Sequence, residues 1–195
     1  MKIKTIIGID LAGMPENPTG WAIWRNKRIE AALLYADDQI VEAIFQNQPD
    51  ILAIDAPFSL PKSGLFRKAD KEMIKRGYRV FPPTLPAMKK LTLRAMALNR
   101  LISEKELKTI EAHPTSTRKT LGMPKKNWKT IQAMLVEMGL GGDPATRALA
   151  SHEIDAVLAA FTAHLHLKGQ TEALGDDDEG YIIIPNKQDW RTLKI

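Results

Sequence analysis

Short apolar runs alternate with longer amphipathic stretches along this chain of 195 residues. Several segments have the length, the apolar composition and the flanking turn residues of strands. These segments are 3–10, 20–24, 28–35, 51–54, 106–112 and 181–184. The second and third are joined near Asn26 and Lys27, so we expect them to form a hairpin.

Apolar positions with helical spacing predict helices between these strands. The predicted helices cover 37–46, 66–76, 87–102, 128–138 and 143–167. The last of them begins at Asp143 and Pro144, a pair typical of a helix start, with Asp as the N-cap and Pro at the first helical position. The alternation of strands and helices predicts an α/β protein.

Residues 57–105 interrupt this alternation. Pro57, Pro61 and Gly64 break the chain, and two predicted helices follow on either side of the Pro82-Pro83 pair. We therefore expect a helical insertion at 57–105 within a single domain that covers residues 1–195.

Four acidic residues stand out against the apolar pattern. Asp10, Asp55 and Glu111 each end an apolar run, and Asp155 lies inside an alanine-rich helical stretch. The carboxyl ends of parallel strands meet at one edge of a sheet, where open α/β folds place their sites. One acid after a strand is often only a turn former or a helix cap, but four in compatible positions favour a shared site. Several carboxylates close together need a cation, and oxygen ligands suit Mg²⁺ or Mn²⁺.

The charge of the chain is unevenly distributed. The net charge is +5, but residues 62–100 alone carry eleven basic and two acidic side chains, which leaves the remainder negative. A basic segment beside an acid-bearing body favours a polyanionic partner such as DNA or RNA. The candidates for contacts to backbone phosphates are Arg67, Arg76, Arg79 and Lys89.

Composition narrows the class of protein further. There is no cysteine, which excludes disulfides and thiolate zinc sites. No apolar run approaches the roughly 18 residues that a membrane span needs, and the first residues lack the apolar core of a signal peptide. We expect a cytoplasmic protein without a membrane partner, and the sequence leaves the oligomeric state open.

Short motifs follow one another in an informative order. They are Gly8-Ile9-Asp10-Leu11-Ala12-Gly13, Ile54-Asp55-Ala56-Pro57, Arg79-Val80-Phe81-Pro82-Pro83, Glu111-Ala112-His113-Pro114 and His152-Glu153-Ile154-Asp155-Ala156. The first motif resembles the start of RNase H-like folds of the Holliday-junction resolvase type. The ordered set resembles the family called domain of unknown function 429, regarded as predicted RNase H-like nucleases.

This resemblance implies an RNase H-like α/β fold with a mixed five-stranded sheet flanked by helices. In such a sheet an antiparallel meander precedes the parallel strands that hold Asp55 and Glu111. The resemblance also implies metal-binding acids at Asp10, Asp55 and Asp155, with Glu111 as a further candidate. The basic helical insertion departs from a minimal domain of this kind.

The leading hypothesis is a Mg²⁺- or Mn²⁺-dependent phosphodiesterase, a nuclease, in which Asp10, Asp55, Glu111 and Asp155 hold the metal and carry the catalysis. One alternative is a nucleic-acid-binding module of the same fold without catalysis, because fold does not determine function. A second alternative is an ATP-dependent phosphotransferase, which the absence of a Gly-x-x-x-x-Gly-Lys phosphate loop disfavours.

Overall fold

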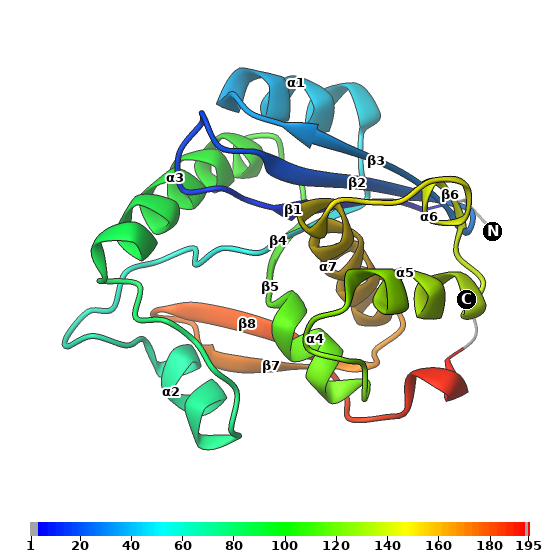
Figure 1. Cartoon of the computed structure of the whole chain (residues 1–195). Coiled ribbons are helices and arrows are strands. Elements are labelled where there is room, and N and C mark those ends of the chain that lie inside the picture. The colour runs from blue at the N-terminus through cyan, green and yellow to red at the C-terminus, as the bar shows by residue number, and fades with distance from the viewer. Residues whose placement is uncertain (1–3, 194) are drawn as a thin grey trace.

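The computed structural model describes residues 4–193 and 195, and Figure 1 shows how its elements are arranged. The strands are β1 (Thr5–Asp10), β2 (Thr19–Arg25), β3 (Arg28–Leu34), β4 (Ile51–Ile54), β5 (Thr109–Ala112), β6 (Gly141–Gly142), β7 (Thr171–Asp176) and β8 (Gly180–Pro185). The helices are α1 (Asp37–Asn47), α2 (Lys68–Lys75), α3 (Pro86–Ser103), α4 (Pro114–Thr120), α5 (Trp128–Glu137), α6 (Asp143–Thr146) and α7 (Ser151–Leu167), with a 3₁₀ turn at Trp190–Thr192.

Within the described residues, the strands form one eight-stranded sheet in the order β6-β3-β2-β1-β4-β5-β8-β7. β1, β2 and β3 form an antiparallel meander, and β4, β5 and β8 continue the sheet parallel to β1. The predicted fold class is confirmed, as are the meander and the two parallel strands that lead to Asp55 and Glu111. The sheet is wider than the five strands that the resemblance implied, because β8 with its antiparallel partner β7 and the short β6 extend its two edges.

Helices cover both faces of the sheet (Figure 1). On one face, α7 and α5 pack over a core that includes Ile6, Ala22 and Ala53. On the other face, α1 and α3 pack over the neighbouring residues in the same strands, such as Ile7 and Ile9. Side chains alternate between the two faces of a strand. The face on which an apolar residue packs therefore fixes the face to which the next residue along the strand points.

Helix α7 lies very close to the sheet, and glycines make this approach possible. A Cβ atom on Gly8 in β1 would lie 2.0 Å from the carbonyl oxygen of Ala156 in α7. A Cβ atom on Gly20 in β2 would lie 1.9 Å from the carbonyl oxygen of His152. Since Gly20 is paired with Asp10 across the strands, the start of α7 comes to lie directly over the end of β1.

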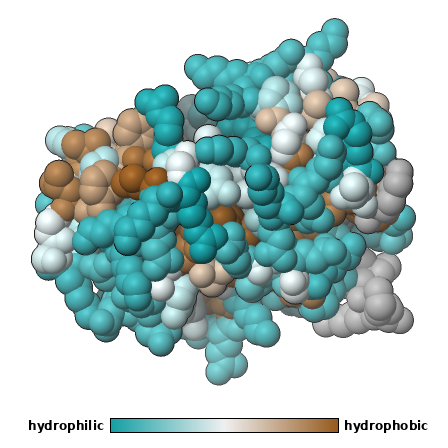
Figure 2. Space-filling model, turned by 90° about the horizontal axis from the view of Figure 1, so that it is seen from below, coloured by the Kyte–Doolittle hydropathy of each residue, from teal (hydrophilic) through white to brown (hydrophobic). Residues whose placement is uncertain are grey.

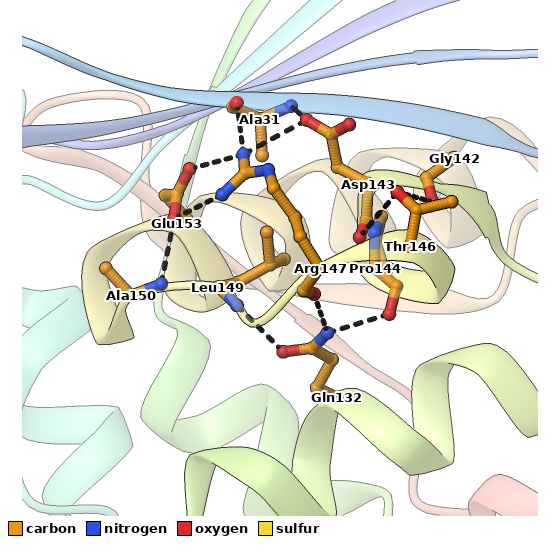
Figure 3. A network of polar contacts seen from close by, with 10 residues as sticks. All are labelled: Ala31, Gln132, Gly142, Asp143, Pro144, Thr146, Arg147, Leu149, Ala150 and Glu153. Carbon is orange, nitrogen blue, oxygen red and sulfur yellow. Dashed lines mark hydrogen bonds and ion pairs between the residues drawn. The ribbon is translucent and has the colours of Figure 1, made fainter.

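The helix predicted over 143–167 is in fact two helices, α6 and α7, with a sharp break between them. The Gln132 amide nitrogen donates to the carbonyls of Pro144 (2.7 Å) and Arg147 (2.6 Å), and its oxygen accepts from the Leu149 N–H at 3.0 Å. Figure 3 shows this side chain reaching up from α5 into the break. A tertiary contact thus satisfies backbone groups that a continuous helix would have paired internally.

Two other features complete the fold. Helix α4 lies where no helix was predicted from the sequence. Its sequence Pro-Thr-Ser-Thr-Arg-Lys-Thr has low helix propensity, and packing against α7 and β8 stabilises it. In residues 57–105, α2 packs through Ala69 and Met73 onto the β7–β8 hairpin. No helix in residues 4–193 and 195 has the length and apolar character needed to cross a membrane.

Candidate active site

A cavity of about 200 Å³ opens at the carboxyl ends of β1, β4 and β5. Its lining includes Asp10, Asp55 and Glu111 from the three strand ends, and His113, which follows β5. Further lining residues come from the segment 57–105, among them Arg67 and Phe81. The sheet edge predicted to hold the acids therefore borders a real cavity.

Asp10, the last residue of β1, is held by the first turn of α7. Its Oδ2 lies 2.6 Å from Nδ1 of His152, and the close approach of α7 over Gly20 permits this contact. Burial raises the pKa of Asp10 above its usual value, while the hydrogen bond and charge of His152 and the charge of Arg118 oppose this shift. In the sequence, His152 precedes Asp155 by three residues, a spacing that places both side chains on one side of a helix.

Asp155 lies one turn further along α7 and is paired with Arg118 of α4. The guanidinium of Arg118 is almost fully buried; it donates to Thr115 Oγ1 at 3.1 Å and lies 4.9 Å above the ring of Trp128. Burial raises the pKa of Asp155 to about 6; the charge of Asp10 acts in the same direction, and Arg118 opposes both. Sequence reasoning missed Arg118, because nothing local marks an Arg in a short polar helix as buried.

Asp55 is the least compensated acid of the site. Its carboxylate accepts no hydrogen bond from any residue in the described part of the chain, although its backbone N–H donates to Ile9 at 2.8 Å. Burial raises the pKa of Asp55 well above its usual value, and the negative charges of Asp10, Asp155 and Glu111 add to the effect. Asp10, Asp55 and Asp155 thus form one electrostatically coupled cluster, in which Asp10 is paired with His152 and Asp155 with Arg118, whereas Asp55 has no such pair among the described residues.

Glu111 does not join this cluster, because it points to the other face of the sheet. It is paired in register with Ile54, which packs beneath α1 and α3, so Glu111 faces that side, while α7 lies on the opposite one. Its two oxygens accept from Arg67 at 2.6 and 2.8 Å, and Oε2 also accepts from the Phe58 N–H at 3.1 Å. Burial raises the pKa of Glu111, and Arg67 counteracts this shift.

Arg67 is an interior residue and not a surface contact for phosphate. Its side chain is 1% exposed and makes hydrogen bonds to Glu111 and, at 2.9 and 3.1 Å, to Asp70. The spacing of Arg67 and Asp70 by three residues at a helix start is the sequence signal that could have indicated this pair. Arg67 therefore has a structural role, the anchoring of α2 to β5, in place of the phosphate contact that was expected from the sequence.

The other three basic candidates lie on the surface. Arg76 is paired with Glu172 of β7, so its charge is partly compensated. Arg79 and Lys89 are exposed, and no ion pair with another described residue involves either of them. Arg79 lies two residues from Phe81 of the cavity wall, and Lys89 follows the cavity-lining Met88. These two remain the better placed of the candidates for binding an anion.

A network of polar contacts fixes the segment that leads into α7 (Figure 3). Arg147 donates to both oxygens of Glu153 (2.7 and 3.1 Å), to Asp143 (3.0 Å) and to the carbonyl of Ala31 in β3 (2.6 Å). Asp143 accepts in turn from the Ala31 N–H at 2.9 Å. Glu153 therefore serves to anchor the helix to β3, away from the acid cluster, and this anchoring sets the position of His152 and Asp155.

The donor set at the cavity suits a hard divalent cation in its chemistry. Asp10 and Asp55 line the cavity, Asp155 interacts electrostatically with both, and His152 contacts Asp10. Oxygen-rich sites of this kind prefer Mg²⁺ or Mn²⁺. In the described part of the chain, however, no three Asp, Glu or His side chains are arranged so that they could hold an ion in their present conformations. Asp10 and Asp155 are instead turned toward His152 and Arg118, so binding a metal would require these side chains to exchange partners.

Comparison with known proteins adds a family and a fold. A family model described as "Protein of unknown function (DUF429)" matches residues 8–180. The structure of Thermus thermophilus RuvC in complex with Holliday junction substrate is similar with 13% identity and a TM-score of 0.55, covering 85% of this chain and 96% of that chain. A second structure of RuvC from the same organism has 14% identity and a TM-score of 0.51, with the same coverage. No curated protein matches this chain. At these identities the likeness to RuvC shows the fold alone.

Proposed function

The chain belongs to the DUF429 family, and on that premise we propose that it is a divalent-metal-dependent phosphodiesterase that acts on nucleic acid. One observation carries the proposal: Asp10 and Asp55, from two strand ends, line a cavity whose lining also includes residues of a strongly basic segment, and Asp155 of α7 interacts electrostatically with both acids. RuvC, which has the same fold, binds a Holliday junction, and this supports a nucleic acid as the partner.

In this proposal Asp10, Asp55 and Asp155 hold the metal. A bound Mg²⁺ or Mn²⁺ would activate a water molecule and neutralise charge on the phosphate. Asp55 is the natural first ligand, because its carboxylate has no hydrogen-bond partner to give up. His152 holds Asp10 in place and Arg118 holds Asp155. A bound cation would compensate the charge of these carboxylates instead.

Glu111 has a positioning role in this scheme. Its ion pair with Arg67 and its hydrogen bond from Phe58 fasten the loop after β4 that carries Asp55. Arg79 and Lys89 supply positive charge at the cavity mouth for the phosphate backbone. Affinity for nucleic acid should therefore fall steeply with salt, since phosphate binding releases counterions.

The replacement of Asp55 by Asn tests the proposal. Cleavage of DNA or RNA in Mn²⁺ should fall at least a hundredfold, and binding of Mn²⁺ measured by calorimetry should weaken. In the absence of metal the variant should be at least as stable as the parent, because a neutral amide avoids the cost of a buried, uncompensated charge. Asp38→Asn, at an exposed position in α1, is the matched control and should change neither the cleavage activity nor the binding of Mn²⁺.

Two results would contradict the proposal. Undiminished cleavage by Asp55→Asn would remove Asp55 from the site. Nucleic-acid binding without turnover, on single-stranded, duplex and branched substrates with Mg²⁺ and Mn²⁺, would identify a binding module that uses the fold without its chemistry.

A further inference from the structure

The wall of the cavity that belongs to the insertion carries an exposed apolar rim. Phe81, Leu65 and Leu85 are 68%, 60% and 42% exposed, and Phe81 is the most exposed of the large apolar side chains described. The Thr84 hydroxyl donates to the carbonyl of Leu65 at 3.3 Å, so the two loops that supply the rim lie side by side. Figure 2 shows apolar side chains gathered at the left end of the molecule, where Figure 1 has the loop before α2 and the start of α3.

Phe81 joins this rim to the acid-lined cavity. Phe81 borders the cavity together with Met88 and Leu91 of α3, while Asp10 and Asp55 line the same cavity. One side of the cavity is thus apolar and the other is acidic. A ligand that fits it has an apolar flat part and an anionic part that a metal ion can bridge to the acids.

The backbone around Phe81 is rigid. Val80 packs into the cluster beneath α2, and the ring of Pro82 restricts the backbone on the other side of Phe81. The Leu85 N–H donates to the carbonyl of Pro82 at 3.0 Å and closes a turn. Because the segment is already ordered, an aromatic contact at Phe81 would cost little additional conformational entropy.

Positive charge beside the rim favours nucleic acid over an apolar protein as the ligand. Arg79 lies two residues before Phe81, and both side chains are exposed, whereas Val80 between them is partly buried. Lys89 and Lys90 are exposed in the first turns of α3. An apolar protein surface would not need these cations, whereas a nucleic-acid strand offers both a flat base and phosphates.

We infer that Phe81 is a stacking platform for an unpaired base, so that the substrate is nucleic acid with single-stranded character at the point of cleavage. This inference rests on the proposed function and narrows its substrate class. A base within a duplex is stacked on both faces and cannot also lie on Phe81 unless it leaves the helix, which costs energy. A base in a single strand is free to stack, and aromatic side chains bind such bases with little regard to sequence.

The test compares single-stranded and duplex DNA of equal length by fluorescence anisotropy. Ca²⁺ replaces Mg²⁺ in the buffer, and the proteins are the full chain and its variants Phe81→Ala and Phe81→Trp. Phe81→Ala should weaken binding of the single strand by about five- to 150-fold and leave duplex binding within twofold. Phe81→Trp should retain the preference for single-stranded over duplex DNA. Leu101→Ala, at an exposed apolar position far along α3, is the matched control and should change neither affinity.

Three outcomes would overturn the inference. They are unchanged single-strand binding by Phe81→Ala, an equal loss for single strand and duplex, and no binding of either nucleic acid by the parent at low salt. The last result would make the rim a protein-binding surface. The Asp55→Asn variant separates this inference from the proposed function, since it should lose cleavage but keep the preference for single strands. If Asp55→Asn still cleaves while Phe81→Ala loses the preference for single strands, only the assignment of the acids would be refuted.

Discussion

The buried cluster of Arg67, Glu111 and Asp70 yields the most direct test of how the site is built. Arg67 is 1% exposed, and its carboxylate partners Glu111 and Asp70 are 5% and 2% exposed. The change Arg67→Met keeps most of the side-chain volume but removes the charge and the four side-chain hydrogen bonds to the two acids, while the backbone N–H of residue 67 still donates to Asp70. Two carboxylates would then remain in the interior without a cation.

Breaking a buried ion pair by removing one partner costs about 3–5 kcal/mol, because the remaining charge keeps its desolvation penalty. We expect Arg67→Met to lose about this amount of its free energy of unfolding. For a chain of this size the loss corresponds to a fall in melting temperature of roughly 6–20 °C. The measurement is urea unfolding followed by tryptophan fluorescence, with Glu111→Gln and the double variant completing a double-mutant cycle.

The dependence on pH gives a second check on the same variant. Burial raises the pKa of Glu111, and Arg67 counteracts that shift, so loss of Arg67 should raise the pKa further. A carboxyl whose pKa is higher in the folded state than in the unfolded state takes up its proton first in the folded state, so lowering the pH favours folding at that group. The destabilisation by Arg67→Met should therefore be largest near neutral pH and shrink as the pH falls toward 5.

A loss below about 1 kcal/mol, the size typical of an exposed ion pair, would refute this reasoning. If the variant were as stable as the parent but bound nucleic acid more weakly, Arg67 would be a phosphate contact, as the sequence had suggested. A coupling energy near zero between Arg67 and Glu111 would show that the two side chains do not depend on each other.

Two further predictions follow from the packing and charge around α7. Gly8→Ala should destabilise the protein by about 1–3 kcal/mol or more in urea unfolding, because its Cβ would lie 2.0 Å from a carbonyl oxygen of α7, whereas Gly13→Ala, with no contact closer than 3.5 Å, should be neutral. Equal effects of the two would show that α7 has room to shift. In the proposed function Asp155 binds the metal as a carboxylate, and burial raises its pKa to about 6. Mn²⁺ affinity measured by calorimetry should therefore decrease as the pH falls through about 6. Arg118→Gln removes a charge that lowers this pKa, so the midpoint should move to higher pH, and a midpoint that stays or moves lower would contradict the assignment.

Much of the fold was predictable because its signals are local. Apolar runs marked six of the strands, and helical spacing marked α1, α2, α3 and α5 within a few residues of their ends. The exceptions were β6, β7, α4 and the break between α6 and α7. These features depend on contacts with distant segments, such as the pairing of β6 with β3 or the hydrogen bonds of Gln132, and such contacts leave no pattern in the segments themselves.

The residues of the site likewise divide into those that local sequence could place and those that depend on tertiary contacts. Asp10 and Asp55 could be placed at one sheet edge because acids directly after parallel strands must lie there, whatever the exact register. Glu111 could not be placed in the same way, because a shift of one residue in register moves a side chain to the other face of the sheet. Its pairing with Ile54 turned it toward Arg67 and away from α7.

The sequence by itself determined which residues end the strands, which segment carries the positive charge, and that the acids needed compensation. It did so because periodicity, charge and chain order are properties of neighbouring residues. Only the tertiary structure decided which side chain meets which acid, namely His152 with Asp10, Arg118 with Asp155 and Arg67 with Glu111. These pairs join residues that lie 142, 37 and 44 positions apart, and the geometry of the first two depends on how closely α7 approaches the sheet over Gly8 and Gly20.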